Sequence, residues 1–236
     1  MEPILATEHI DGGYQGRKVL HDVTLRVNAG EHLLLIGPNG CGKTTLLKVL
    51  AGVLKSDAGR VLFRGQDISS VPAHRRMRHG MGYLMQTGNI FPSLTVNENL
   101  HLSYWHGDGD FRAHRDRLLT VFPMLKDRLA RRAGLLSGGE RQALAVCMVM
   151  IRPAELLLLD EPTAGLAPKA AEEMLRAIRE AQMTLKFASV MVEHNLRLVH
   201  TWVSRVIAMK QGRVAGEETD PSVLLNHDQL QKYYFE

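Results

Sequence analysis

One glycine-rich stretch constrains the fold more than any other part of the chain. Residues Gly37–Thr45 read GPNGCGKTT and match the pattern G-x-x-x-x-G-K-[ST]. The apolar run His32–Ile36 before it predicts a buried strand, and the residues Thr44–Ala51 predict a helix. A strand, a glycine loop and a helix in this order are typical of a phosphate-binding loop, so we expect the chain to bind a nucleotide.

The fixed positions of this loop each have a chemical role. Glycines allow backbone N–H groups to converge on the phosphates, and the helix N-terminus adds a partial positive charge. Lys43 is expected to contact the β- and γ-phosphates, and Thr44 to offer its hydroxyl group to Mg²⁺. The other loop residues expected at the nucleotide are Gly37, Pro38, Asn39, Gly40, Cys41, Gly42 and Thr45.

Two acidic residues follow the most apolar strand of the chain. Leu156–Leu159 is a run of leucines that predicts a fully buried strand, and Asp160 and Glu161 come directly after it. Open α/β sheets bind ligands at the carboxyl ends of their strands. We therefore expect Asp160 to face the phosphate loop and hold Mg²⁺, directly or through water. Glu161 is expected to act as the general base for an attacking water.

Short apolar segments alternate with longer amphipathic segments along most of the chain. Buried strands are expected at His32–Ile36, Met81–Met85, Leu156–Leu159 and Ala188–Val192. Helices are expected at Thr44–Ala51, Gly139–Ile151, Pro168–Ala181 and Asn195–Trp202. This alternation predicts an α/β fold with a mostly parallel core sheet that is covered on both faces.

Two regions depart from the alternation. Closely spaced, turn-rich strands at Leu5–Ile10, Val19–Val27 and Gly59–Phe63 predict an N-terminal antiparallel β-subdomain. A helical insertion is expected from about residue 88 to 135, with helices at Val96–Tyr104 and Phe111–Phe122. We therefore expect one domain, residues 1–236, with the nucleotide-binding core and β-subdomain in 1–87 and 136–236. Short helices are expected in Pro221–Glu236.

Composition narrows the class of protein. An apolar share of 45% and only 2 cysteines indicate a globular chain without a disulfide framework, as in a reducing compartment. The longest apolar run, Ala143–Ile151, is well short of the ~20 residues that span a bilayer, so the chain is expected to be soluble by itself. The net charge of +4 fits a solvated surface, with an anionic ligand or membrane surface as alternatives. Basic residues cluster at His74–His79 and Arg128–Arg132. No aromatic residues interleave these clusters, so no nucleic-acid partner is expected.

The pentapeptide Leu136–Glu140, LSGGE, lies between the phosphate loop and the acidic pair. With Gln86 and His194, these motifs stand in an order that resembles the ATP-binding subunit of an ABC transporter, over essentially the whole chain. The resemblance implies an ATPase that uses ATP and Mg²⁺ and is bound peripherally to a membrane permease, on the cytoplasmic side of the inner membrane. The residues Gly88–Tyr104 are expected to dock on that permease.

The resemblance assigns three further roles within one subunit. It implies that Tyr14 stacks on adenine, that Gln86 approaches Mg²⁺ and the attacking water, and that His194 contacts the γ-phosphate. It also implies a second ATPase subunit, in a homo- or heterodimer, docked head to tail. The γ-phosphate held by one chain is then capped by three residues of the other, Ser137, Gly138 and Gly139.

One position departs from the general family pattern. Most ABC proteins carry an aspartate at the position of Ala167, where it helps the two ATP sites communicate, so strict coupling between the sites is in doubt. The stretch Gly165–Pro168 is instead similar to ATPases of the branched-chain amino-acid and urea uptake branch, and the stretch Ile90–Leu100 resembles the same branch. Uptake of such a solute is therefore expected. Two alternatives stay open: an export ATPase for lipid or lipopolysaccharide, and a soluble ABC ATPase not linked to transport.

Overall fold

The computed structural model describes residues 2–105 and 107–226, which form two compact units. Unit 1 consists of Met1–Tyr83, Glu155–Asp160 and Phe187–Glu236. Unit 2 consists of Leu84–Ala154 and Glu161–Lys186. Each unit therefore joins segments that are far apart in the sequence. The expected helical insertion, about residues 88 to 135, lies within unit 2.

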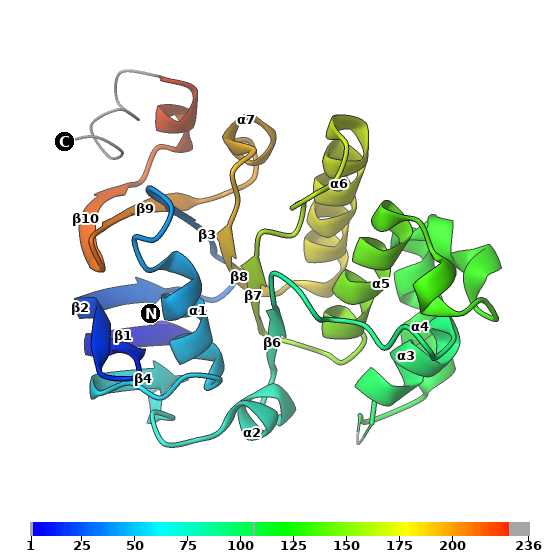
Figure 1. Ribbon diagram of the computed structural model, residues 1–236, viewed down its shortest axis with the longest axis horizontal. Coiled ribbons are helices and arrows are strands. Elements are labelled where there is room, and N and C mark those ends of the chain that lie inside the picture. Colours follow the sequence, from blue (N-terminus) through cyan, green and yellow to red (C-terminus); the bar gives the residue numbers. More distant parts are fainter. Residues whose placement is uncertain (1, 106, 227–236) are drawn as a thin grey trace. The chain divides into compact units, whose positions relative to one another are not determined.

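Unit 1 contains a four-stranded antiparallel sheet. Its order is β2-β1-β4-β5, with bounds β1 (Leu5–Tyr14), β2 (Arg17–Val27), β4 (Ala58–Phe63) and β5 (Gln66–Asp67). All neighbouring pairs are antiparallel, and β1 shifts register three times along β2. The expected antiparallel β-subdomain is confirmed (Figure 1).

A six-stranded sheet forms the core, in the order β10-β9-β3-β8-β7-β6. Its strands are β3 (His32–Ile36), β6 (Met81–Leu84), β7 (Leu156–Asp160), β8 (Ala188–Val192), β9 (Arg205–Lys210) and β10 (Arg213–Glu218). The pairs β9–β3, β3–β8 and β8–β7 are parallel, whereas β10 runs antiparallel to β9. The expected α/β fold with a parallel core is confirmed, and β9 and β10 extend it beyond the strands predicted from the sequence.

Buried side chains hold helix α1 (Lys43–Ala51) against this sheet. Alternate residues of β3 and β7 join a core cluster with α1, among them Leu33, Leu35, Leu46, Leu50, Leu156 and Leu158. The intervening residues Leu34 and Leu157 are also fully buried, so both faces of the central strands are covered. Burial of each such leucine stabilises the fold by roughly 1.5–3 kcal/mol. The core therefore fixes α1 relative to the strand ends.

Arg76 of helix α2 (Ala73–Arg78) forms hydrogen bonds to the C-terminal end of α1. Only 3% of it is exposed, although the sequence around it reads as a basic surface cluster. Its guanidinium group donates to five backbone oxygens, those of Val49, Leu50, Ile68, Ser69 and Val71. Burial lowers the pKa of Arg76 to about 10, so the group is still charged at neutral pH. One side chain thus ties α1 to the β5–α2 connection.

Unit 2 is helical. Its helices are α3 (Val96–Ser103), α4 (Phe111–Val121), α5 (Gly138–Met150) and α6 (Pro168–Leu185), with short 3-10 helices η1 (Pro123–Arg128) and η2 (Ala133–Leu135). Helix α5 packs on α3 and on α6, and α4 packs on α6. The helices expected in 96–104 and 111–122 are therefore present, each ending within one residue of its expected bound.

A fully buried amide holds the loop that precedes α3. Asn99 donates to the backbone oxygens of Phe91, Leu94 and Thr95 and accepts from the N–H group of Phe91. Backbone hydrogen bonds from residues 129–134 pair with the same loop, including Gly134 N–H to the oxygen of Pro92. The loop is therefore joined to the segment that leads into α5.

Two helices in the C-terminal third of the chain differ in length from expectation, and α6 continues to Leu185 beyond its expected end at Ala181. Helix α7 covers only Leu196–Val199 rather than Asn195–Trp202. After Val199 the chain makes tight turns, because Ser204 must reach the oxygen of His32 before β9 begins. A 3-10 helix, η3 (Pro221–Leu225), accounts for the start of the expected helical tail. Residues 227–236 of that tail lie outside the described residues.

The helices that the structure describes lie within residues 2–105 and 107–226. None of them combines the necessary length with the necessary apolar character.

We expect Arg76→Met to lower the free energy of unfolding by about 3 kcal/mol, because five buried backbone oxygens would lose their donor. Urea denaturation of the purified chain measures this value. Arg75→Met is the matched control, since Arg75 is the exposed neighbour on the same helix. Equal stability of the two variants would show that Arg76 does not anchor α1.

Candidate nucleotide-binding site

Three parallel strands of unit 1 end in one row of the six-stranded sheet. Leu35 of β3 lies opposite Val192 of β8, and Val192 lies opposite Asp160 of β7. Neighbouring strands are about 4.8 Å apart. Figure 1 shows β3, β8 and β7 as neighbours in the sheet. The phosphate loop, Asp160 and His194 therefore emerge along the same edge. This carboxyl edge is where open α/β sheets bind ligands.

The phosphate loop depends on glycine. Gly37, Gly40 and Gly42 have φ values of 135°, 78° and 106°, which residues with side chains rarely adopt. A Cβ atom on Gly37 would also lie 2.1 Å from the backbone oxygen of Met209. Gly42 is the N-cap of α1 and supplies no side-chain acceptor. The first N–H groups of α1 are therefore left for an anionic ligand.

Lys43 is folded over this loop. Its Nζ atom donates to the backbone oxygens of Gly37, at 2.7 Å, and Pro38, at 3.1 Å, and the residue is 7% exposed. Among the residues that the structure describes, no carboxylate forms an ion pair with Lys43. The positive charge is thus held at the loop by neutral backbone oxygens, which the charged oxygens of a phosphate would replace.

Thr44 and Asp160 meet beside the loop. The Thr44 Oγ1 atom donates to Asp160 Oδ1 at 3.0 Å, and Asp160 is fully buried. A hydroxyl and a carboxylate are oxygen donors of the kind that Mg²⁺ binds together with substrate phosphates. The residues expected at the metal from unit 1 therefore fit such an ion chemically.

Tyr14 lies at the end of β1, next to α1. Its ring is 5.5 Å from Nζ of Lys48, and 41% of the residue is exposed. This cation–π contact leaves part of the ring available for stacking on a planar group. The structure thus brings the expected adenine-binding aromatic to the helix that carries the phosphate loop.

A buried acid that the sequence reasoning missed shapes the turn after β8. Glu193 is 4% exposed, and its Oε1 atom accepts from the N–H groups of His194, at 2.7 Å, and Asn195, at 3.0 Å. The turn presents His194 as an exposed side chain. A glutamate beside an expected functional histidine was the available signal, because short side chain to backbone contacts commonly fix turns.

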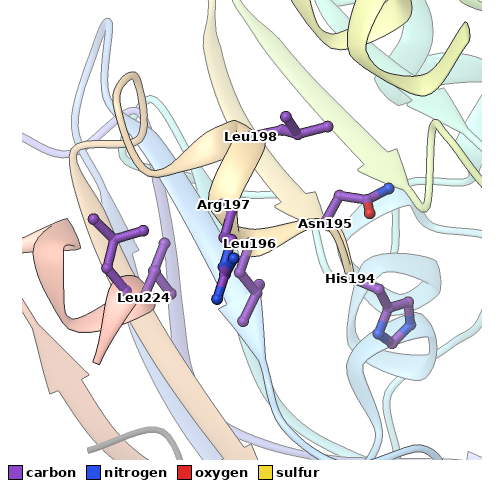
Figure 2. Close-up of a pocket in the computed structure, with 7 residues that line it drawn as sticks. His194, Asn195, Leu196, Arg197, Leu198 and Leu224 are labelled. Atoms are coloured by element: carbon purple, nitrogen blue, oxygen red, sulfur yellow. The ribbon is translucent and has the colours of Figure 1, made fainter. Parts of the chain in front are cut away.

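His194 also borders a hollow of about 360 Å³ that is lined by Asn195, Leu196, Arg197, Leu198, Leu224 and Leu225. Figure 2 shows Leu196, Arg197 and Leu224 gathered together, with the imidazole of His194 directed away from Leu224. The lining is rich in leucine and lacks the converging N–H groups of the phosphate loop. The hollow is therefore not suited to a triphosphate.

Two expected catalytic residues contact each other in unit 2. Gln86 Nε2 donates to Glu161 Oε2 at 3.0 Å. Glu161 has a φ of 51°, a left-handed conformation that is uncommon for residues other than glycine. Gln142 of α5 donates to the oxygen of Pro162 at 2.8 Å, so the turn that carries Glu161 is tied to α5. The side chain of Glu161 is therefore held in a defined place.

The LSGGE pentapeptide forms the start of α5, as expected. Ser137 is the N-cap: its Oγ atom accepts from the Glu140 N–H group at 3.2 Å, and Glu140 Oε2 accepts from the Ser137 N–H group at 2.8 Å. Arg128 binds the other oxygen of Glu140 at 2.8 Å. The Ser137 N–H group first, and then Arg128, lower the pKa of Glu140. Arg128, whose contact spans two segments, was not found from the sequence.

Packing among the described residues does not require the two glycines of the pentapeptide. A Cβ atom on Gly138 would meet no other atom within 4 Å, and one on Gly139 would meet only Ala170, at 3.9 Å. Ser137 and Gly138 are exposed, at the positive end of a long helix. Close approach from outside the chain therefore explains these glycines better than packing within it.

Comparisons with known proteins agree with this geometry. The family model described as "ABC transporter" matches residues 20–164. A probable branched-chain amino acid transport ATP-binding protein of Archaeoglobus fulgidus is 38% identical over 97% of each chain. A high-affinity branched-chain amino acid transport ATP-binding protein of Pseudomonas aeruginosa is 33% identical, over 94% of this chain and 96% of its own. A lipopolysaccharide export system ATP-binding protein of Haemophilus influenzae is 32% identical, over 98% of this chain and 96% of its own.

Solved structures give the same result. A nucleotide-free ATP-binding cassette from an ABC transporter superposes with a TM-score of 0.84 at 27% identity, covering 99% of this chain and 100% of its own. The ADP conformation of such a cassette has a TM-score of 0.81 at 28% identity, covering 99% of both chains. The resemblance expected from the motifs is confirmed. The chain belongs to the ABC transporter family, as an ATP-binding and ATP-hydrolysing subunit.

Proposed function

We propose that this ATPase hydrolyses ATP with Mg²⁺ at the phosphate loop and powers solute uptake through a separate membrane permease. The observation that carries the proposal is the contact between Thr44 and Asp160 at 3.0 Å, beside the uncapped N-terminus of α1. A hydroxyl and a carboxylate oxygen beside the loop support a site for Mg²⁺ next to bound phosphates. Tyr14 and His194 are proposed to contact the adenine and the γ-phosphate, respectively.

The residues of unit 1 supply binding and charge. The N–H groups of Gly37–Thr45 surround the phosphates, and Lys43 exchanges its backbone acceptors for phosphate oxygens. Thr44 and Asp160 would hold Mg²⁺, which neutralises charge on the β- and γ-phosphates when bound. Holding the triphosphate at these groups orients the γ-phosphate for attack by water.

Glu161 is proposed as the general base that takes a proton from the attacking water. It follows Asp160 directly, so the peptide bond keeps the base next to the proposed metal ligand. Its hydrogen bond to Gln86 restrains the carboxylate, and Gln86 would in turn approach both the metal and the water. Proton removal requires the Glu161 carboxylate in its ionised form.

Completion of the site is proposed to come from a second ATPase subunit. Ser137 uses its oxygen to accept from the Glu140 N–H group, which leaves its O–H proton to donate outward. Gly138 and Gly139 leave space for an approaching phosphate at the positive end of α5. These features support a head-to-tail dimer in which Ser137, Gly138 and Gly139 cap the γ-phosphate bound by the other subunit.

The proposed solute is a branched-chain amino acid or a related amide or urea. Support comes from the relatives of Archaeoglobus fulgidus and Pseudomonas aeruginosa, whose names state branched-chain amino acid transport. The permease would dock on residues 88–104 of unit 2, where Phe91 is 49% exposed and Leu102 is 40% exposed. The subunit would then lie at the cytoplasmic side of the inner membrane, held there by the permease.

Lipopolysaccharide export is the second candidate, because a relative of that name is 32% identical over 98% of this chain. Import and export ATPases use the same catalytic groups, so these groups do not distinguish the two functions. The solute that stimulates ATP hydrolysis does distinguish them. Reconstitution with each class of permease, followed by measurement of solute-stimulated ATP hydrolysis, distinguishes the two. Stimulation only with an amino acid permease and its binding protein supports uptake.

Glu161→Gln should reduce kcat by at least about 100-fold, because the general base is lost, while ATP binding is retained. Phosphate release measures kcat, and gel filtration with ATP should show an accumulated dimer. Glu172→Gln is the control, since Glu172 is an exposed residue of α6 paired with Arg176. Normal turnover in Glu161→Gln would exclude the proposed base.

Ser137→Arg should stop hydrolysis but change ATP affinity of the monomer by no more than about threefold, since the residue is proposed to act on the other subunit's nucleotide. Titration of dilute monomer with a fluorescent ATP analogue measures the affinity. Thr184→Arg adds the same charge at an exposed position of α6 and should leave both properties intact. Loss of monomer binding in Ser137→Arg would mean that Ser137 serves its own chain.

Phe91→Asp should reduce transport by at least about tenfold, while the purified subunit keeps its basal ATP hydrolysis. A charge in an apolar docking surface opposes burial against a partner. Transport into proteoliposomes that contain the permease measures coupling. Met183→Asp is the control, because Met183 is 73% exposed on α6, outside residues 88–104. Equal transport by the two variants would place the permease elsewhere.

A further inference from the structure

Tyr83 of β6 carries a polar group that neither the sequence motifs nor the proposed catalytic groups explain. Its Oη atom is buried and has no hydrogen-bond partner of ordinary geometry among the described residues. A buried hydroxyl group without a partner costs about 1–3 kcal/mol. Such a group calls for a specific explanation, since buried polar atoms in native proteins are generally paired.

The Asp160 carboxylate lies near this hydroxyl group. Strand β6 is the neighbour of β7, which ends at Asp160, and both residues belong to unit 1. Burial, and next the negative charge of Asp160, raise the pKa of Tyr83. The hydroxyl group of Tyr83 is therefore within electrostatic reach of the acid whose Oδ1 atom already accepts from Thr44.

The hydrogen bond from Thr44 does not by itself fix the orientation of the Asp160 carboxylate. The terminal torsion of aspartate has a broad energy profile, so the group can turn about its last bond while one oxygen stays bonded. A donor on another side of the carboxylate would restrict this rotation. The phenol of a tyrosine is protonated at neutral pH and donates one hydrogen bond, which suits that purpose.

We propose that Tyr83 is a positioning residue that donates to the Asp160 carboxylate and fixes its orientation for Mg²⁺ bound with ATP. The inference rests on the proposed role of Asp160 at the metal. Thr44 and Tyr83 hold the acid from two neighbouring segments, α1 and β6. Thr44 would be needed by the metal when Mg²⁺ is bound with ATP, and Tyr83 would then remain as a donor that holds the carboxylate.

The test is Tyr83→Phe, which removes only the hydroxyl group. Binding of ATP is measured by calorimetry with Mg²⁺ and again with EDTA. We expect ATP binding to be about tenfold weaker with Mg²⁺, because one hydrogen bond to a charged group is lost. Binding in EDTA should be unchanged. The Mg²⁺ concentration at half-maximal ATP hydrolysis should rise by the same factor, with kcat at saturating Mg²⁺ close to that of the parent protein.

Two further variants locate the effect. Tyr104→Phe removes the hydroxyl group that donates to the Asp108 oxygen in unit 2 and should leave Mg²⁺ dependence unchanged. In an Asp160→Asn background, Tyr83→Phe should produce no further loss, because both changes act through the same carboxylate. Additive losses would contradict the inference.

Three results are decisive. Parent-like Mg²⁺ dependence of Tyr83→Phe would overturn the inference, as would an equal loss of binding with and without Mg²⁺, which indicates a general packing role. Failure of the proposed function looks different, because the unaltered protein would then hydrolyse ATP without any dependence on Mg²⁺.

Discussion

Parallel alignment of β3, β8 and β7 is the constraint on which the candidate site depends. Hydrogen bonding between these strands sets Leu35, Val192 and Asp160 side by side. The leucine side chains of β3 and β7 pack against α1 and hold it on the sheet. Both ends of α1 are fixed. The backbone geometry of the loop glycines fixes its start, and hydrogen bonds from Arg76 fix its C-terminal end, so the phosphate loop keeps its position. The expected site residues of unit 1 come from distant parts of the sequence. They lie near one another because the register of the strands places the ends of β3, β8 and β7 in one row.

Unit 2 provides a continuous series of contacts of a different kind. Asn99 fixes the loop that carries Phe91, and this loop pairs with residues 129–134. Arg128, just before that segment, binds Glu140 at the start of α5. From α5, Gln142 reaches the turn that carries Glu161. Discrete, mutually dependent hydrogen bonds therefore connect the exposed loop to both the LSGGE pentapeptide and the acidic turn within one compact unit.

Local signals made much of this predictable. The phosphate loop, the buried strands before it and before Asp160, and the N-cap at Ser137 each depend on residues close together in the sequence, and the structure has them where expected. Strands β9 and β10 were missed, because the apolar run of β9 is only four residues long and β10, which pairs with β9, has no buried residue. The contacts of Arg128 and Glu193 depend on side-chain direction, which periodicity does not specify. The roles assigned to the expected site residues stay predictions, whereas the fold and the family are confirmed.

The start of α6 differs chemically from the starts of α3 and α5 in unit 2. Helices α3 and α5 begin with capping boxes that use Glu98 and Glu140, whose pKa values are lowered by the Thr95 and Ser137 N–H groups. Those caps stabilise the fold above the unfolded pKa of glutamate and are lost as pH falls through the lower folded value. Helix α6 begins at Ala167 with no side-chain cap and with proline at its first position. Acid should therefore fray α3 and α5 from their N-termini while α6, whose first turn contains no acidic residue, keeps its first turn.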